Sequence, residues 1–326
     1  MALAASSGPL SQPGRLRAWF RGLSAATALS VFALIVLGGV VRVTGSGLGC
    51  PDWPLCHGGF LPPLELEAVI EYSHRLVASA VVGPLVLATC VVAWAGYRRE
   101  KWVLVPATVA LVMMLAQALL GGVTVLNELP ASAVAAHLAL GEALLACVTL
   151  LVVVAVRGPL RFSKEGLQGA RLGGRTAHFP LLVLISGFSL YVLLLTGSYV
   201  TMSGATVACL DWPLCRGNTL PTSTLAMIHM LHRVVGIAVG ILLLYSLHLG
   251  FRDKRNSAVI RVFSLVVAAS FLAQVVVGAV AVWLRFPVEL RALHLALATL
   301  VWGTMVALAS LVFVRPDIPA GGGVRA

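Results

Sequence analysis

Residues 49–57 read GCPDWPLCH, and residues 208–216 read ACLDWPLCR, so a polar loop with two cysteines occurs twice in one very apolar chain. The sequence around the two loops repeats as well, at an offset of about 158 residues throughout. The aligned residues are His74-Arg75 with His232-Arg233, Gln117 and Gly121 with Gln274 and Gly278, and His137 with His294. Self-similarity at one steady offset indicates two copies of one structural unit.

The composition indicates a protein that lies within a membrane. Of the 326 residues, 59% are hydrophobic and only 11% are charged, too few to keep a soluble surface of this size in water. A spanning helix needs about 20 apolar residues. Eight such stretches are predicted, at 24–43, 67–97, 102–126, 132–156, 179–200, 222–250, 258–284 and 290–314.

The repeat and the helices together predict the fold class and the domains. Each repeat contains four helices, and an even number of spans returns the chain to the same side of the membrane. Both repeats therefore have the same orientation, which indicates a parallel internal repeat. We expect an all-α polytopic membrane protein with eight transmembrane helices in two pseudo-symmetric four-helix bundles. Its expected parts are a cytoplasmic N-terminal tail at 1–23, a bundle at 24–156, a cytoplasmic linker at 157–178, a second bundle at 179–314 and a cytoplasmic tail at 315–326.

The first apolar stretch is interpreted as a retained helix. It follows three arginines, as a signal peptide would, but it runs into Arg42 without a convincing cleavage site. A cleaved signal and a short organelle transit peptide are the alternatives, the latter because the segment lacks acidic residues.

The distribution of basic residues predicts the orientation in the membrane. The formal net charge is +11, and 17 of the 23 Lys and Arg residues lie in the two terminal segments and in loops expected on the same side. The positive-inside rule makes that side cytoplasmic and leaves both cysteine loops outside a bacterial inner membrane. The basic charge therefore reports orientation, and no nucleic-acid partner is expected.

Six arginines break this pattern, because they are expected near the outer face: Arg42, Arg75, Arg216, Arg233, Arg285 and Arg291. Either a function there requires positive charge, or these side chains snorkel and pair with nearby acidic residues.

The two cysteine loops are each predicted to contain a disulfide. Pro and Asp between the cysteines favour a tight turn, and disulfides persist outside the cytoplasm. The predicted pairs are Cys50–Cys56 and Cys209–Cys215. A redox-active pair and a metal site are the alternatives, the metal site being disfavoured because His57 is replaced by Arg216 in the second loop.

The intramembrane histidines suggest a cofactor, because ionisable residues inside membrane helices are rare and need a reason. Two repeat-related pairs are expected at similar depth, His74 with His137 and His232 with His294. Facing each other across a four-helix core, each pair could hold heme iron through two axial imidazoles. Zinc and copper fit less well, because each half offers two imidazoles while zinc usually takes three or four protein ligands.

The two halves differ next to these histidines. Glu71 precedes His74 by three residues and shares its helix face, whereas His229 occupies the corresponding position of the second half. This difference suggests that one half carries out chemistry while the other stores or relays electrons; alternatively, Glu71 is a helix-start carboxylate. Heme propionates need cations at the ring edge, and the hypothesised contacts are Arg42, Arg75 and Arg233.

The motifs TGSGLGCPDWPLC at 44–56, EYSHR at 71–75, DWPLC at 211–215 and LHR at 231–233, with the helix-borne histidines His137 and His294, resemble the heme A synthase family. The resemblance covers nearly all of residues 24–314. It implies an oxidoreductase that oxidises a ring methyl of heme O to a formyl group, giving heme A for terminal respiratory oxidases. It further implies that His74 and His137 flank heme O, that His232 and His294 ligate heme B, and that Glu71 is the catalytic carboxylate.

The same resemblance implies functional coupling to heme O synthase and to terminal oxidase assembly. It leaves open the electron donor, the oxygen source and whether the protein is a homo-oligomer. A diheme b-type electron-transfer cytochrome is the alternative function, which explains the histidine pairs but not the difference between Glu71 and His229. A transporter built from parallel repeats is disfavoured, because the polar groups gather in the outer third rather than at mid-membrane.

Overall fold

The computed structural model describes residues 14–158, 178–215, 221–253 and 256–313, and in these ranges the regular structure is helical. Within them, eight helical segments are long and apolar enough to cross a membrane, which confirms a multi-pass all-helical membrane protein. The helices are α1 (Gly14–Val43), α2 (Leu66–Val77), α3 (Gly83–Gly96), α4 (Lys101–Leu126), α5 (Ala131–Arg157), α7 (Phe179–Met202), α8 (Thr224–Arg252), α9 (Ala258–Trp283) and α10 (Val288–Phe313). Helices α2 and α3 form one span, because a π-helical turn, η2 (Ala78–Val82), joins them without a break.

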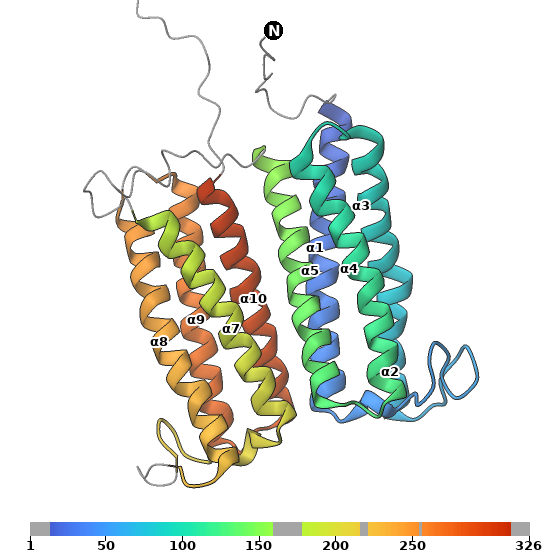
Figure 1. The fold of residues 1–326 in the computed structure, drawn as a ribbon, viewed down its shortest axis with the longest axis vertical. Helices are drawn as coiled ribbons and strands as arrows, with labels where there is room; N and C mark the ends of the chain where they lie inside the picture. The colour runs from blue at the N-terminus through green and yellow to red at the C-terminus, as the bar shows by residue number, and fades with distance from the viewer. Residues whose placement is uncertain (1–13, 159–177, 216–220, 254–255, 314–326) are drawn as a thin grey trace, which may run out of the picture.

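The helices form two groups that stand side by side, α1–α5 and α7–α10 (Figure 1). In the first group, α1 and α4 each pack against both α3 and α5, so the α2–α3 span stands diagonally opposite α5. In the second group, α7 and α9 each pack against both α8 and α10, so α8 stands diagonally opposite α10. The groups meet along a seam, where α1 and α5 pack against α10 and α5 also packs against α7.

Apolar side chains fill both interiors and also cover the outside. Val31, Leu144 and Val148 are buried in the first group, and Leu243 and Met305 in the second. Large apolar side chains also cover the outer surface, among them Leu29, Phe188 and Ile241. Lipid accepts such a surface, and the helices satisfy their own backbone hydrogen bonds, as a membrane span requires.

Helix α1 begins at Gly14, so residues 14–23 of the expected cytoplasmic tail are helical. Arg21 explains why a basic segment can be helical here. It donates through Nε to the carbonyl oxygen of Ala155 at 3.0 Å and through Nη2 to that of Val156 at 3.3 Å. These are among the last carbonyls of α5, which lack partners within their helix and favour a cation. Most of the linker predicted at 157–178 and all of the tail at 315–326 lie outside the described residues.

The turn η2 is a difference between the two groups that the repeat does not predict. Pro84, directly after it, has no backbone N–H and cannot make the helical bond to a residue four positions earlier. The chain compensates with a wider turn, in which Gly83 N–H donates to Ala78 O. Helix α8, which carries the matching histidine, runs through its whole length without such a turn.

The cysteine loops that follow α1 and α7 lie at the same end of the molecule, and the turn between α3 and α4 lies at the opposite end (Figure 1). Each loop begins with a left-handed glycine and a short 3₁₀ turn, Gly45 before η1 (Ser46–Leu48) and Gly204 before η4 (Ala205–Val207). Both glycines have φ near +75°, which L side chains rarely adopt.

Candidate functional site

The first cysteine loop is closed by the disulfide predicted from the sequence. Cys50 and Cys56 are bonded, with their Cα atoms 4.7 Å apart, and both are buried against Ala68 of α2. The second loop has the same construction, since Cys209 and Cys215 are bonded with their Cα atoms 5.0 Å apart. Each loop is therefore a compact cap fixed to the first turns of a helix that carries a histidine.

Asp52 organises the turn inside the first cap. Its carboxylate accepts hydrogen bonds from the backbone N–H groups of His57 at 2.6 Å and Gly58 at 2.8 Å. The N–H of Gly58, followed by that of His57, holds the pKa of the Asp52 carboxyl below its usual value. The ring of His57 in turn lies 2.9 Å from the carbonyl oxygen of Gly49. Asp52 and His57 thus stabilise the loop through hydrogen bonds to its own backbone.

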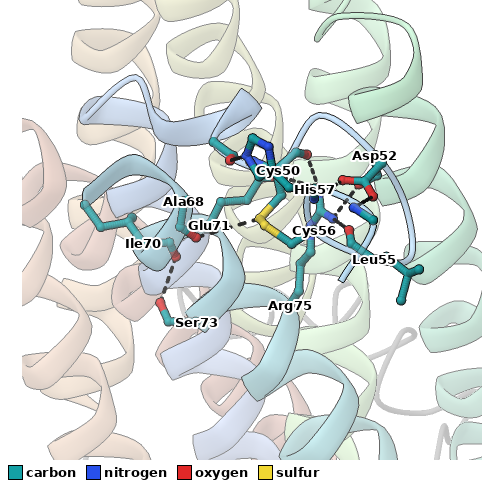
Figure 2. The surroundings of a disulfide bond; sticks show 12 residues. Cys50, Asp52, Leu55, Cys56, His57, Ala68, Ile70, Glu71, Ser73 and Arg75 are labelled. Carbon is teal, nitrogen blue, oxygen red and sulfur yellow. Dashed lines mark hydrogen bonds and ion pairs between the residues drawn. A yellow bond between two sulfur atoms is a disulfide. The ribbon is translucent and has the colours of Figure 1, made fainter. Parts of the chain in front are cut away.

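Glu71 and Arg75 attach this cap to α2 (Figure 2). Glu71 is buried, and its Oε2 accepts a hydrogen bond from the backbone N–H of Cys50 at 2.9 Å while its Oε1 pairs with Arg75 Nη2 at 2.5 Å. Arg75 also donates to the carbonyl oxygens of Asp52, Leu55 and Cys50 at 2.6 to 2.7 Å. Its guanidinium is directed at loop backbone, and a propionate contact, as expected from the sequence, would have to share these donors.

In the second half, His229 takes the place of Glu71 and makes a similar attachment. It is buried, with Nδ1 3.0 Å from Ala205 O and Nε2 3.2 Å from Arg233 Nη2. Arg233 donates to Asp211 O at 2.6 Å and to three further carbonyls of the second loop. The sequence suggests a polar core residue at His229 rather than a ligand, and the structure shows that it anchors the second cap.

The first histidine pair faces the interior of its bundle from diagonal helices. His74 lies on α2 and His137 on α5, which belong to spans that stand diagonally opposite each other. Each imidazole packs on a glycine of a neighbouring helix, so that a Cβ at Gly38 would lie 3.1 Å from His74 Nε2, and one at Gly121 would lie 3.3 Å from His137 Cε1. The Nδ1 atom of His137 is buried without a hydrogen-bond partner.

The second pair repeats this arrangement. His232 lies on α8 and His294 on α10, which stand diagonally opposite each other. A Cβ at Gly197 would lie 3.1 Å from His232 Cε1, and one at Gly278 would lie 2.9 Å from His294 Cε1. His294 Nδ1 is buried without a partner, whereas His232 Nδ1 lies 2.8 Å from the hydroxyl of Thr196.

These observations fit a ligand that takes one imidazole from each side. Buried polar atoms are nearly always hydrogen-bonded, so the unpartnered ring nitrogens of His137 and His294 need an explanation. Over the described residues, no cluster of three or more His, Cys, Asp and Glu side chains could hold a metal ion by itself. Heme iron can take two axial imidazoles, and two imidazoles are what each pair offers.

A buried carboxylate at the seam was missed by the sequence analysis. Glu142 of α5 is fully buried, and its Oε1 accepts a hydrogen bond from the hydroxyl of Thr299 on α10 at 2.7 Å. The indole N–H of Trp302 donates to the backbone oxygen of Glu142 at 2.9 Å. The available signal was a lone Glu within an apolar run. Glu142 aligns with Thr299 at the repeat offset, so the second half has no acidic residue at that position.

The comparisons with known proteins cover both halves. A family model described as cytochrome oxidase assembly protein matches residues 21–306, a range that includes both caps and all four paired histidines. A heme A synthase of Bacillus licheniformis is 33% identical over 222 residues, which are 67% of this chain and 70% of the relative. Heme A synthases of Bacillus mycoides and Bacillus cereus are 28% and 29% identical over 285 residues, which are 86% of this chain and 88% of each relative.

Proposed function

The chain belongs to the heme A synthase family of cytochrome oxidase assembly proteins, and from this premise we propose that it oxidises the ring methyl of heme O to the formyl group of heme A. The observation that supports this proposal most directly is the pair of imidazoles in each bundle, each packed on a helix glycine. Two such pairs in one chain allow a substrate heme and a resident heme to be bound at the same time.

The first bundle is our proposed substrate half, with His74 and His137 on either side of heme O. Glu71 supports this assignment, because it places a buried carboxylate one helical turn from His74. Conversion of a methyl to a formyl group removes electrons, releases protons and adds an oxygen atom, and a bound heme would supply the redox chemistry. Glu71 then accepts a proton or stabilises the positive charge that develops nearby.

The second bundle is our proposed heme B half, with His232 and His294 as iron ligands. His229 stands there in place of Glu71 and is held between Ala205 and Arg233, so this half offers no carboxylate at the equivalent position. A resident heme that only transfers electrons requires no proton acceptor beside it. The Thr196 hydroxyl, 2.8 Å from His232 Nδ1, fixes the orientation of that ring, as the outer partners of metal-binding histidines usually do.

We place the caps outside the cytoplasm and both termini inside, in the inner membrane of a bacterium. Basic residues gather at the end of the molecule opposite the caps: Arg21, Arg98, Arg99, Lys101, Arg157 and Arg252. The positive-inside rule assigns that end to the cytoplasm. We further propose that heme O comes from a heme O synthase and that heme A passes to terminal oxidase assembly.

Heme extraction and mass analysis of the purified protein test this function. The wild-type protein is expected to contain heme B together with heme O or heme A, whereas heme B alone would indicate a diheme electron-transfer cytochrome. Glu71→Gln should retain its heme but yield no formyl product, and His74→Ala should lose the heme of the first bundle. His248→Ala is the matched control, because this histidine is exposed near the far end of α8. Normal heme A from Glu71→Gln would remove Glu71 from the mechanism.

A further inference from the structure

Two arginines meet at the seam between the bundles, at the end that carries the caps. Arg42 lies in the last turn of α1 and Arg291 in the first turn of α10, and Arg291 contacts the backbone of Val43, the residue that follows Arg42. Each reaches into the other half of the molecule. Arg42 Nη2 lies 3.4 Å from Thr201 O near the end of α7, and Arg291 Nη1 lies 3.4 Å from Val43 O at the end of α1.

The charge of this pair is not neutralised by protein carboxylates. Over the described residues, the one ion pair joins Glu71 to Arg75, away from the seam. The contacts of Arg42 and Arg291 are long hydrogen bonds to backbone oxygens and a weak contact of Arg42 with the sulfur of Met202. In addition, Arg42 Nε is buried without a partner. Partly buried cations of like sign are costly without an anion, so the pair needs one.

Each arginine shares a helix face with a residue of a histidine site. Arg42 follows Gly38 by four residues and shares its face of α1, and Gly38 is the glycine that packs on His74. Arg291 precedes His294 by three residues and shares its face of α10. Helices α1 and α10 approach closely at this level, because a side chain at Gly39 would collide with Leu295. The arginine pair therefore lies one turn outward from both sites, on the two helices that separate them.

We propose that Arg42 and Arg291 form one shared anion site that binds the carboxylate groups of the hemes across the seam. The inference rests on the proposed function and extends it in two ways. It adds Arg291 to the heme contacts, and it lets an arginine of each bundle bind the heme of the other bundle. Arginine suits this role, since its planar fork matches a carboxylate with two parallel hydrogen bonds. Arg75 and Arg233, by contrast, hold the caps through backbone carbonyls.

Heme B and its dimethyl ester test the proposal, because the ester removes both carboxylates and keeps the iron and the ring. The full-length protein, produced in heme-deficient cells, is titrated with each compound and followed by its Soret band. We expect wild type to bind the acid at least about tenfold more tightly than the ester, the gain typical of charged hydrogen bonds. In R42M/R291M this preference should disappear while the ester binds as before. Repeating both titrations in the His74→Ala and His232→Ala backgrounds shows which heme supplies the carboxylate.

Arg285→Met is the matched control, since it removes one positive charge from the same end of the molecule, where Arg285 donates to Leu210 O at 3.2 Å. It should keep the wild-type preference for the acid. If R42M/R291M weakens acid and ester equally, the pair is only a brace between helix ends and the proposal is overturned. Equal binding of acid and ester by wild type overturns it as well. Failure of wild type to bind either compound would instead refute the proposed function.

Discussion

Gly278→Ala is the substitution that tests the histidine sites most sharply. In the interior of a helix, Gly→Ala normally stabilises by about 1 kcal/mol, because glycine is a poor helix former. At Gly278 of α9, the new Cβ would lie 2.9 Å from Cε1 of His294 and 3.3 Å from its Nδ1. Ordinary van der Waals contact begins at 3.4 Å, so the imidazole must move by about 0.5 Å.

A shift of that size is as large as the tolerance of a preorganised site, about 0.5 Å. We therefore expect Gly278→Ala to keep or raise the thermal stability of the heme-free protein while it loses most of the heme from the second bundle. The assay is the ratio of heme to protein after purification, together with a thermal melt in detergent.

Gly236→Ala on α8 is the control for this experiment. Its Cβ would lie 3.8 Å from Leu193, an ordinary contact, so it should gain stability and keep both hemes. Full heme content and an unchanged Soret band in Gly278→Ala would refute the assignment of His294 as a ligand.

Three further predictions concern the first cap and the seam. Arg75→Met removes the donors to three loop carbonyls and should destabilise the cap by about 3 kcal/mol, measured as faster proteolysis of the loop; an unchanged rate would contradict this. The pKa of Asp52 is lower when the protein is folded, so its stabilisation is present above its ordinary pKa of about 4 and disappears as pH falls through the lowered value. Proteolysis of the cap should therefore accelerate on acidification, and Asp52→Asn should abolish that dependence. Glu142→Ala leaves the Thr299 hydroxyl unpaired and should cost about 2 kcal/mol in thermal unfolding, whereas Glu142→Gln should cost much less.

The sequence predicts the helices well because each is a long apolar run between turn residues or charges. Helix α1 starts before the apolar stretch that predicts it, and there the side chain of Arg21 bonds to α5 carbonyls 134 and 135 residues away. Composition cannot reveal such a contact. The π-helical turn had a local signal in Pro84, but whether a proline bends, breaks or widens a membrane helix depends on its neighbours.

For the site, the repeat relates the two proposed histidine pairs to each other, and the turn residues between the cysteines predicted the disulfides, which the structure confirms. The repeat could not predict that Gly38 and Gly278 are the surfaces on which the rings pack, because small residues in membrane helices serve many close contacts. Nor could it show that Arg75 turns back to the loop, since that depends on the loop's path over α2.

The wider turn beside Pro84 gives the two bundles unequal mechanical properties. A π-helical turn holds an extra residue that a regular helix has no place for, so the segment between His74 and α3 can change its pitch without breaking the span. The uninterrupted α8 has no equivalent freedom around His232. Under the proposed function, the first bundle takes in and releases a heme in every cycle and would gain from such compliance, whereas the second bundle keeps its heme and needs none.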